Sequence, residues 1–232
     1  MNQEETSRTR LLLGDAALTR LAQARVALFG VGGVGGHCAE ALVRAGIGAL
    51  DLYDNDVVSP SNLNRQIVAL HSTLGQYKAE VMARRAADIN PDCQVRAVPM
   101  FYLPENADQV NLSQYDYVID AIDTVSAKLE LAQRCYRLHV PLISCMGSGN
   151  KLDPSAFVVT DLYKTQGCPL ARVLRKELRR RGVPKLKVVF SPEEPASTGE
   201  RTPGSVPFVP GAAGLVLAGA VVRALAAGRT EE

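Results

Sequence analysis

Residues 25–37 read Arg-Val-Ala-Leu-Phe-Gly-Val-Gly-Gly-Val-Gly-Gly-His, a short apolar run followed by a turn rich in glycine. The next residues, 38–46, have the composition of a helix. Gly30 and Gly32 permit a tight turn and the close approach of a ligand, whereas Gly35 lets the helix pack on the strand. Free N–H groups at the start of a helix attract anions. This strand, turn and helix together predict a binding site for nucleotide phosphate.

A carboxylate stands where a nucleotide-binding fold would use it. The apolar run 49–53 predicts a second strand, and Asp54 follows it directly. In dinucleotide-binding folds an acidic residue about 20 positions beyond the glycines binds the ribose. Asp54 is therefore the candidate for ribose binding. The alternative is a glycine-rich turn that binds no ligand.

The composition predicts a folded protein of the reduced cytoplasm. The chain has 232 residues, 47% of them hydrophobic, and its net charge is only +2. These values exclude a disordered chain and give no overall signal of nucleic-acid binding. The five cysteines form no C-x-x-C pair, and the amino terminus has no signal peptide. We therefore expect no structural zinc and a cytoplasmic location.

Strand and helix patterns alternate through most of the chain. Apolar runs at residues 94–99, 117–123 and 141–145 predict strands, and segments 75–89 and 126–138 predict helices. Such alternation implies a Rossmann-like, doubly wound and mostly parallel sheet of the α/β class.

We expect a single domain over residues 1–232 that has three parts. Residues 1–24, with leucines at near-helical spacing from residue 11 onward, are predicted to form a helical arm. Residues 25–150 form the nucleotide-binding core, and residues 151–232 form an extension of strands and helices.

The extension has a less regular pattern than the core. Strands are predicted at residues 156–160 and 187–190, with a helix at 169–181 between them. Residues 191–207 hold four prolines and no apolar period, which is typical of a mobile surface loop that gates a site. Residues 208–227 are strongly apolar, but prolines, glycines and an arginine interrupt them. A buried helix, and no stable membrane span, is therefore expected there.

Polar side chains collect after the predicted strands, where open parallel sheets bind their ligands. Arg65 and Lys78 suit an enzyme that cleaves ATP, because cations stabilise charge on phosphoryl oxygens. Asp123 then supplies a carboxylate for Mg²⁺. Each residue also has a simpler interpretation: Arg65 in a solvated loop, Lys78 on a charged helix face, Asp123 as a helix cap.

The order and spacing of these motifs resemble the adenylating domain of ubiquitin-activating-enzyme-like proteins. The similarity rests on the glycine turn, Asp54-x-Asp56, residues 61–66 (Ser-Asn-Leu-Asn-Arg-Gln), Lys78 and residues 121–123 (Ala-Ile-Asp). The resemblance implies catalytic roles for Arg65 and Lys78 at the triphosphate of ATP, and for Asp123 at Mg²⁺. It further implies a homodimer in which Arg8 reaches the site of the neighbouring subunit.

The resemblance also implies the full set of nucleotide contacts. The residues concerned are Gly30, Gly32, Gly33, Gly35, Asp54, Asp56, Asn62, Arg65, Gln66 and Lys78. ATP and Mg²⁺ are the expected cofactors, and a monovalent cation is left open as a further ligand.

One branch of this family fits the remainder of the chain. Residues 150–154, 161–165, 187–191 and 208–214 are similar to the enzymes that dehydrate threonylcarbamoyladenosine in tRNA. In that branch ATP adenylates the threonyl carboxylate of the modified adenosine beside the anticodon. An intramolecular attack then expels AMP and closes a ring. The resemblance therefore implies a modified tRNA as the substrate.

The charge distribution gives separate support for a tRNA partner. Residues 172–187 carry eight basic side chains against the single acidic residue Glu177, a local charge of +7. A basic helix can contact the phosphate backbone, although a solvated helix face is the alternative. Leu170, Val173, Leu174 and Leu178 are expected to form its buried side. The candidate tRNA-binding residues are Arg172, Arg175, Lys176, Arg179, Arg180 and Arg181.

Three other functions stay open as alternatives. A sulfur-carrier adenylyltransferase has the same fold, but commonly carries zinc-binding C-x-x-C pairs that are missing here. A nicotinamide-dependent oxidoreductase would not need Arg65 and Lys78. A non-catalytic subunit would not need every nucleotide-site residue. Cys145 and Cys168 are interpreted as structural, because ring closure requires no nucleophile from the enzyme.

Overall fold

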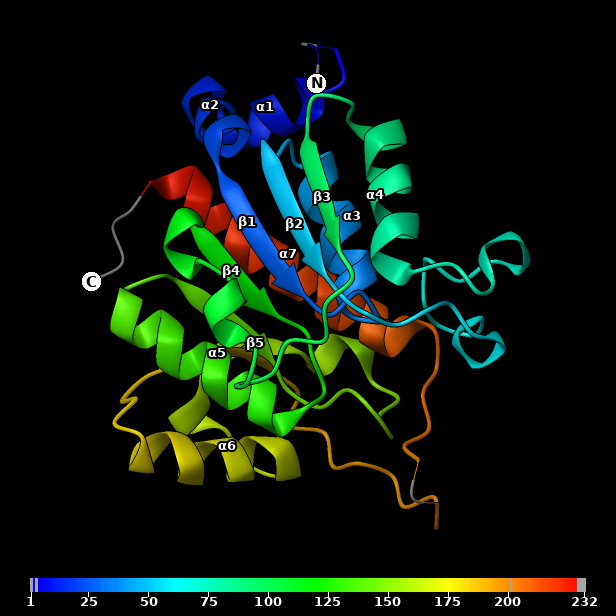
Figure 1. Ribbon diagram of the computed structural model, residues 1–232, viewed down its shortest axis with the longest axis vertical. Helices are drawn as coiled ribbons and strands as arrows, with labels where there is room; N and C mark the ends of the chain where they lie inside the picture. Colours follow the sequence, from blue (N-terminus) through cyan, green and yellow to red (C-terminus); the bar gives the residue numbers. More distant parts are fainter. Residues whose placement is uncertain (1, 3, 201, 229–232) are drawn as a thin grey trace.

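The computed structural model describes residues 2, 4–200 and 202–228 and has the expected Rossmann-like α/β fold (Figure 1). Within these residues the strands form one sheet in the order β3 (Gln94–Val98), β2 (Ala49–Tyr53), β1 (Arg25–Phe29), β4 (Tyr117–Asp120), β5 (Leu142–Cys145), β7 (Lys187–Phe190) and β6 (Val158–Asp161). Only the edge pair of β6 and β7 is antiparallel in this described sheet. The chain order reverses between β1 and β4, and open α/β sheets bind ligands at the carboxyl ends beside such a reversal.

Helices cover both faces of the sheet, as the alternation of side chains in a strand requires. Val26 and Leu28 of β1 share a core with α3 (Gly35–Arg44), α4 (Lys78–Ile89) and α7 (Phe208–Ala227). In Figure 1, α3 and α7 lie behind the sheet and α4 lies to the right of β3. Ala27 and Phe29 instead face α5 (Val125–Leu138) in a second core. A third core joins α5 to α6 (Pro169–Arg180). Because β1 is buried on both faces, its residues after Arg25 are all apolar.

The apolar helix α7 packs inside the protein, as the sequence predicted. By length and composition it is the one described helix that could cross a membrane, a test that buried core helices also pass. It contacts α2, α3 and the strands β5, β6 and β7. A Cβ atom at Gly214 would come within 2.3 Å of the Val34 carbonyl oxygen, so only glycine permits this close crossing with α3. This packing explains the apolar composition without a membrane.

The expected helical arm is two helices. α1 (Ser7–Leu13) ends at Gly14, and α2 (Asp15–Gln23) begins directly after it. Gly14 has a φ of 80°, which a continuous right-handed helix cannot contain. The predicted helical arm is therefore divided into two helices at this glycine.

Two other boundaries differ from the sequence prediction for local reasons. The helix expected from residue 75 begins at Lys78, because Gly75 adopts a left-handed turn with a φ of 79°. The strand expected to reach residue 123 ends at Asp120. There the Asp120 carboxylate accepts a hydrogen bond from the Ile122 backbone N–H and turns the chain away from the sheet.

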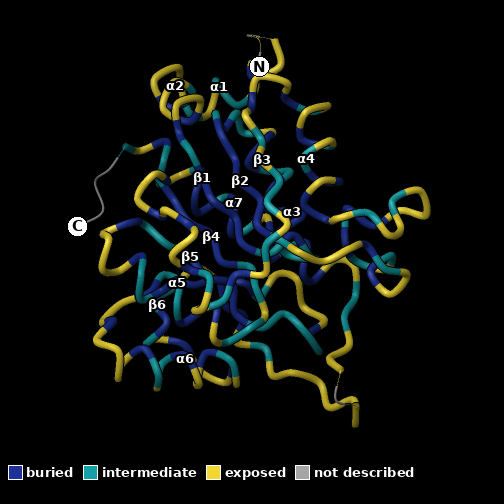
Figure 2. Tube along the Cα trace, in the orientation of Figure 1, coloured by how far each residue is buried: buried dark blue, intermediate teal, exposed yellow. Residues whose placement is uncertain are grey.

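The expected loop at residues 191–207 contains no helix or strand in its described part, and most of it is exposed (Figure 2). Residue 201 of this loop lies outside the described residues, as do parts of the expected arm (1–24) and extension (151–232). Mobility of the loop stays a prediction.

Candidate nucleotide-binding site

The glycine turn occupies the space between β1 and the end of β4. Gly30 has a φ of 90°, and a Cβ there would lie 2.7 Å from the Ala121 carbonyl oxygen. At Gly35 a Cβ would approach the Gly30 carbonyl oxygen to 1.8 Å. These contacts require glycine for packing. Gly32 has no such contact, since its nearest non-neighbouring atom is the Gln66 Nε2 at 3.8 Å. Its missing side chain leaves room that a ligand can use.

Asp54 anchors the glycine turn to the end of β2. Its Oδ2 accepts a hydrogen bond of 2.6 Å from the Val31 N–H, and its Oδ1 accepts one of 2.8 Å from the Asp56 N–H. Burial raises the pKa of the Asp54 carboxyl above its usual value, although these N–H groups and Lys78 act in the opposite direction. A carboxylate oxygen accepts more than one hydrogen bond. Asp54 can therefore also accept a bond from a ribose hydroxyl.

Lys78 is not on a solvated helix face. It lies in the first turn of α4 with only 5% of its surface exposed, and its Nζ is 2.7 Å from an Asp56 carboxylate oxygen. The Lys78 N–H also donates to the Asp56 carbonyl oxygen. A lysine this buried is held in place, and Asp56 is the exposed partner of the pair. The arrangement presents one cation at the carboxyl edge of the sheet.

The loop after β2 brings two predicted residues, Arg65 and Gln66, to the glycine turn, and a third, Asn62, shapes the loop. Asn62 is buried and its Oδ1 accepts a hydrogen bond from the Ser59 N–H, which shapes the loop. Gln66 is also buried, and its Oε1 has no hydrogen-bond partner within the described protein. Buried polar atoms are nearly always paired. The unpaired Gln66 Oε1 is therefore available to hydrogen-bond a bound ligand.

Arg65 lies close to the glycine turn and is partly exposed. Its Cγ is 3.7 Å from the position of a Cβ at Gly33. Its Nη1 donates to the Ser61 carbonyl oxygen and to the Asn64 Oδ1, at 2.8 and 2.9 Å. These are neutral acceptors, so the guanidinium charge is not neutralised by them. The Arg65 guanidinium can therefore turn toward an anionic ligand at a small cost in free energy.

Asp123 is exposed in the loop between β4 and α5, the loop that Gly30 contacts at Ala121. It does not cap α5, because the N-cap residue is Thr124 and no side chain makes a capping hydrogen bond. Its Oδ1 accepts only a long contact of 3.4 Å from the Thr124 hydroxyl. The simple interpretation as a helix cap is therefore wrong. A carboxylate of this kind, beside a phosphate-binding turn, fits Mg²⁺.

Arg8 is not brought into this site within the same chain. It is exposed on α1, which lies at the amino ends of the strands, away from the glycine turn (Figure 1). A catalytic role for Arg8 therefore requires a second copy of the chain.

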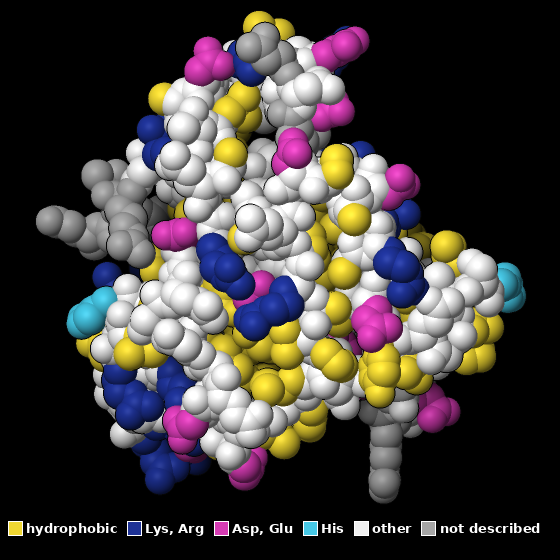
Figure 3. Space-filling view, turned by 45° about the horizontal axis from the view of Figure 1, so that its top comes forward, with side chains coloured by type: hydrophobic (Ala, Val, Ile, Leu, Met, Phe, Trp, Pro, Cys, Tyr) yellow, Lys and Arg dark blue, Asp and Glu magenta, His cyan; other side chains and the backbone are white. Residues whose placement is uncertain are grey.

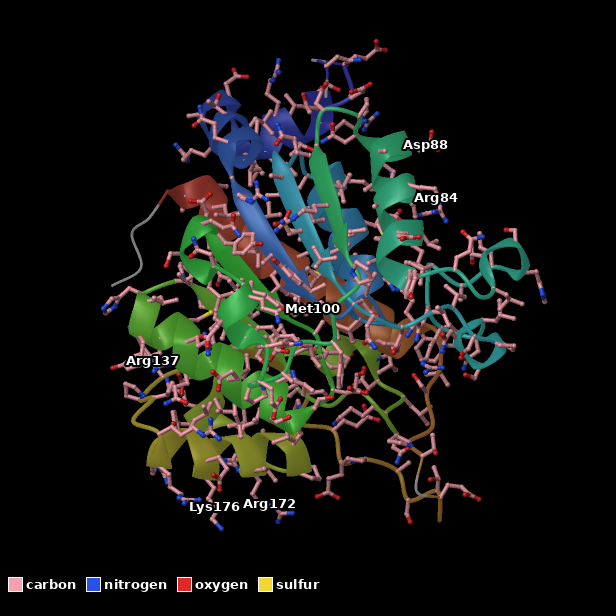
Figure 4. The ribbon with its side chains drawn as sticks, in the orientation of Figure 1. Arg84, Asp88, Met100, Arg137, Arg172 and Lys176 are labelled. Carbon is pink, nitrogen blue, oxygen red and sulfur yellow. The ribbon has the colours of Figure 1, made fainter. Side chains whose placement is uncertain are left out.

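The basic residues of α6 form one surface. Figure 3 shows Lys and Arg side chains gathered at the lower left, the side on which α6 lies, and in Figure 4 Arg172 and Lys176 point away from the protein. A shallow hollow on this surface is lined by Arg172, Arg175, Lys176, Arg179 and Arg180.

The predicted basic residues differ in how firmly they are held. Arg175 donates to the Thr165 carbonyl oxygen, and the Arg179 guanidinium lies 5.3 Å from the centre of the Tyr163 ring. Arg180 pairs with Glu177, and Arg181 donates to Gln133.

The apolar side of α6 differs from the prediction at one position. Val173 is 44% exposed, whereas Ala171, Leu174 and Leu178 are fully buried. Leu170 is partly buried against the same core. Val173 was therefore wrongly assigned, because the buried stripe runs through the smaller Ala171 instead.

Sequence reasoning missed the residues that tie the loop 191–207 to this edge of the sheet. Asn150 adopts a left-handed φ of 57° and exchanges hydrogen bonds with Gly204, while its carbonyl oxygen accepts from the Ala196 N–H. Asn64 donates to the Ser205 carbonyl oxygen. Asparagine after two glycines is a signal for a left-handed turn that could have found Asn150.

The cysteines do not offer a nucleophile. All five are free and buried. Burial raises the pKa of Cys145 to about 12, so its thiol is protonated near neutral pH. Cys168 is 5% exposed at the start of α6. Among the described residues no group of three or more His, Cys, Asp or Glu side chains could hold a metal ion.

The sheet order, the glycine turn and the cations beside it define a nucleotide-binding protein of the adenylating class. The chain belongs to the ThiF family, whose model matches residues 6–232.

Within this family the chain is similar to one kind of enzyme over nearly its whole length. It is 43% identical over 234 residues to the tRNA threonylcarbamoyladenosine dehydratase of Bacillus subtilis, covering 93% of this chain and 92% of that protein. Crystal structures of the Escherichia coli tRNA N6-threonylcarbamoyladenosine dehydratase with AMP and with ATP superpose with TM-scores of 0.91 and 0.90, at 39% identity, and cover 97% of this chain. The resemblance stated from the sequence is thereby confirmed.

The sulfur-carrier alternative is a more distant match. The sulfur carrier protein ThiS adenylyltransferase of Escherichia coli is 34% identical over 164 residues, which cover 68% of this chain and 63% of that protein. The similarity to the dehydratases is both higher and longer. Membership of the ThiF family also sets aside a nicotinamide-dependent oxidoreductase.

Proposed function

We propose that this protein catalyses the ATP-dependent dehydration of threonylcarbamoyladenosine in tRNA. The observation that carries this proposal is the 43% identity to a dehydratase over 93% of the chain. The nucleotide site supports it, because the residues expected at ATP lie together at the carboxyl edge of the sheet. The reaction joins the threonyl carboxylate to AMP with release of pyrophosphate, after which a nitrogen of the substrate attacks the acyl carbon, expels AMP and closes a ring.

The site residues have separate tasks in this proposal. Asp54 accepts a ribose hydroxyl, and the glycine turn surrounds the phosphates with backbone N–H groups. Arg65 and Lys78 stabilise the negative charge that develops on the phosphoryl oxygens. Bound Mg²⁺ would neutralise phosphate charge, and Asp123 is the residue that would hold it. No enzyme nucleophile is needed, because the substrate itself supplies the attacking nitrogen.

The decisive experiment uses the product mass. The protein is incubated with ATP, Mg²⁺ and threonylcarbamoylated tRNA, and the tRNA is then digested to nucleosides. We expect a modified nucleoside lighter by one water, formed together with AMP. An unchanged nucleoside would contradict the proposal. AMP formation driven by a small carrier protein with a Gly-Gly tail would instead support the sulfur-carrier alternative.

The tRNA is proposed to lie along α6. Arg172 and Lys176 are exposed and point outward, which leaves their charges available to phosphate (Figure 4). The other basic residues of α6 also contact neighbouring residues of the protein, which fixes their positions. They are therefore proposed to contribute to the shape of the tRNA-binding surface as well as to its charge. The tRNA substrate and the reduced, buried cysteines both support a cytoplasmic location.

Replacing Arg172 and Lys176 together with alanine is expected to weaken tRNA binding and to lower the slope of log affinity against log salt by about 2, because each phosphate contact contributes about 1. ATP affinity should not change. Fluorescence anisotropy with labelled tRNA at several salt concentrations measures this slope. Arg84→Ala, on the distant helix α4, is the matched control and should leave the slope unchanged (Figure 4). An unchanged slope in the double variant would mean that α6 is a solvated face.

The active form is proposed to be a homodimer in which Arg8 acts in the partner's site. The arm supports this, because Leu11 and Leu12 on α1 are 86% and 88% exposed and offer apolar surface for a second copy. Because α1 lies away from the glycine turn of its own chain, Arg8 is proposed to act only in the site of the partner subunit (Figure 1).

A further inference from the structure

A lysine and an aspartate are fully buried beneath the loop that carries Asp123. Lys128 of α5 and Asp120 at the end of β4 each have 1% of their side chain exposed. The Lys128 Nζ lies 3.1 Å from both carboxylate oxygens of Asp120. It also donates to the Ser144 hydroxyl oxygen at 3.2 Å and to the Cys145 carbonyl oxygen at 2.8 Å. All its N–H groups are therefore used, and one side chain connects the ends of β4 and β5.

Stability alone does not account for this pair. Replacing a buried ion pair with apolar side chains of similar size is often neutral or stabilising. Leu131 and Ala132, one turn further along α5 on the same side as Lys128, are buried and apolar, so an apolar side chain would suit the position. A buried network in which every member is bonded fixes a geometry.

The network ends at the loop between β4 and α5. The Asp120 Oδ1, which Lys128 contacts, also accepts the Ile122 N–H at 3.1 Å. That bond sets the turn at Ala121 and Ile122. Gly30 packs against this turn so closely that a Cβ at Gly30 would lie 2.7 Å from the Ala121 carbonyl oxygen. The residue after Ile122 is Asp123. One buried carboxylate thus places both the first glycine of the phosphate turn and the proposed metal ligand.

We propose that the buried Lys128–Asp120 pair is a positioning device that sets the glycine turn and Asp123 in register for ATP and Mg²⁺. This inference rests on the proposed function, because it concerns the same site. Lys128 and Asp120 act through the Ile122 N–H and do not themselves touch the nucleotide.

Two neutral double variants isolate the contact that matters. Asp120→Asn with Lys128→Met removes both charges but keeps a side-chain oxygen that can accept the Ile122 N–H. Asp120→Ala with Lys128→Met removes that oxygen as well. We expect the Ala/Met variant to bind ATP with Mg²⁺ at least about tenfold more weakly than the Asn/Met variant, since the loss of one charge-assisted contact through a displaced Asp123 weakens binding about ten- to a hundredfold. Isothermal titration calorimetry measures the affinity without catalysis.

A packing control separates positioning from general loss of stability. Leu131→Ala creates a cavity in the same helix, where Leu131 is fully buried but makes no part of the network. Its unfolding by urea should show a loss of stability, while its ATP affinity stays within about twofold of the wild type. Equal affinities of the two double variants, or an equal loss in Leu131→Ala, would overturn the inference. A wild-type protein that binds no ATP with Mg²⁺ would overturn the proposed function and this inference together.

Discussion

Asp123→Ala is expected to reduce AMP formation about ten- to a hundredfold without affecting the fold. The carboxylate is exposed and makes only a long contact to Thr124, so its loss should change the free energy of unfolding by no more than about 0.5 kcal/mol. Losing one charge-assisted contact at the reacting phosphates removes about 1.5–3 kcal/mol of stabilisation. Release of AMP from ATP with threonylcarbamoylated tRNA measures the effect.

Asp88→Ala is the matched control for this prediction. Asp88 is an equally exposed aspartate near the end of α4, away from the glycine turn (Figure 4). Its replacement should leave AMP formation unchanged. Arg65→Ala should lose activity to a similar degree as Asp123→Ala, because both charges face the phosphates in the proposed function. Near-normal turnover of both site variants would contradict the assignment.

Gly35→Ala is expected to lower the free energy of unfolding by about 3 kcal/mol, the upper end of the range for overpacking. The reason is a collision of its Cβ with the Gly30 carbonyl oxygen at 1.8 Å, an atom of the backbone that no side-chain rotation can move. Helix α3 must then shift away from β1, and nucleotide binding should be lost with it. Urea unfolding followed by circular dichroism measures the stability.

For Gly32→Ala, in the same turn, we expect unchanged stability but weaker ATP binding. No atom beyond its chain neighbours lies closer than 3.8 Å to a Cβ at this position, so the protein should unfold at the same urea concentration as the wild type or slightly above it. ATP affinity should nevertheless fall, because the methyl group would occupy space meant for the ligand. A Gly35→Ala protein as stable as the wild type would contradict the assignment of Gly35 to packing and Gly32 to ligand binding.

Local sequence patterns predicted most of the fold because each pattern reflects a local physical requirement. The alternation of apolar strands and periodic helices indicated the α/β class. Strands β2 and β7 begin and end at the predicted residues. The structure departs from a continuous helical pattern where one residue changes the backbone, as at Gly14 and Gly75, both of which have positive φ values. Val173 was misassigned because alanine and valine are equally compatible with a buried stripe until the neighbouring helix is known.

The candidate site was predictable in its members but not in its arrangement. Spacing identified Asp54, Arg65 and Lys78, because the positions of such residues along the chain follow from the order of strands. It could not show that Lys78 is buried against Asp56, or that the buried Gln66 Oε1 has no hydrogen-bond partner within the described protein. Those facts depend on contacts between segments that are far apart in the sequence.

The sequence by itself determined the class of fold and the chemistry available at the carboxyl edge, since glycine, carboxylate and cation are properties of residue types at fixed spacing. Only the tertiary structure decided which of those side chains are bound to other residues of the protein and which remain available to a ligand. Lys128 and Asp120 lie on different elements, and their pairing exists because α5 packs across the ends of β4 and β5. Their burial excludes water, so the two charges must satisfy each other, and that requirement fixes the loop on which Asp123 stands.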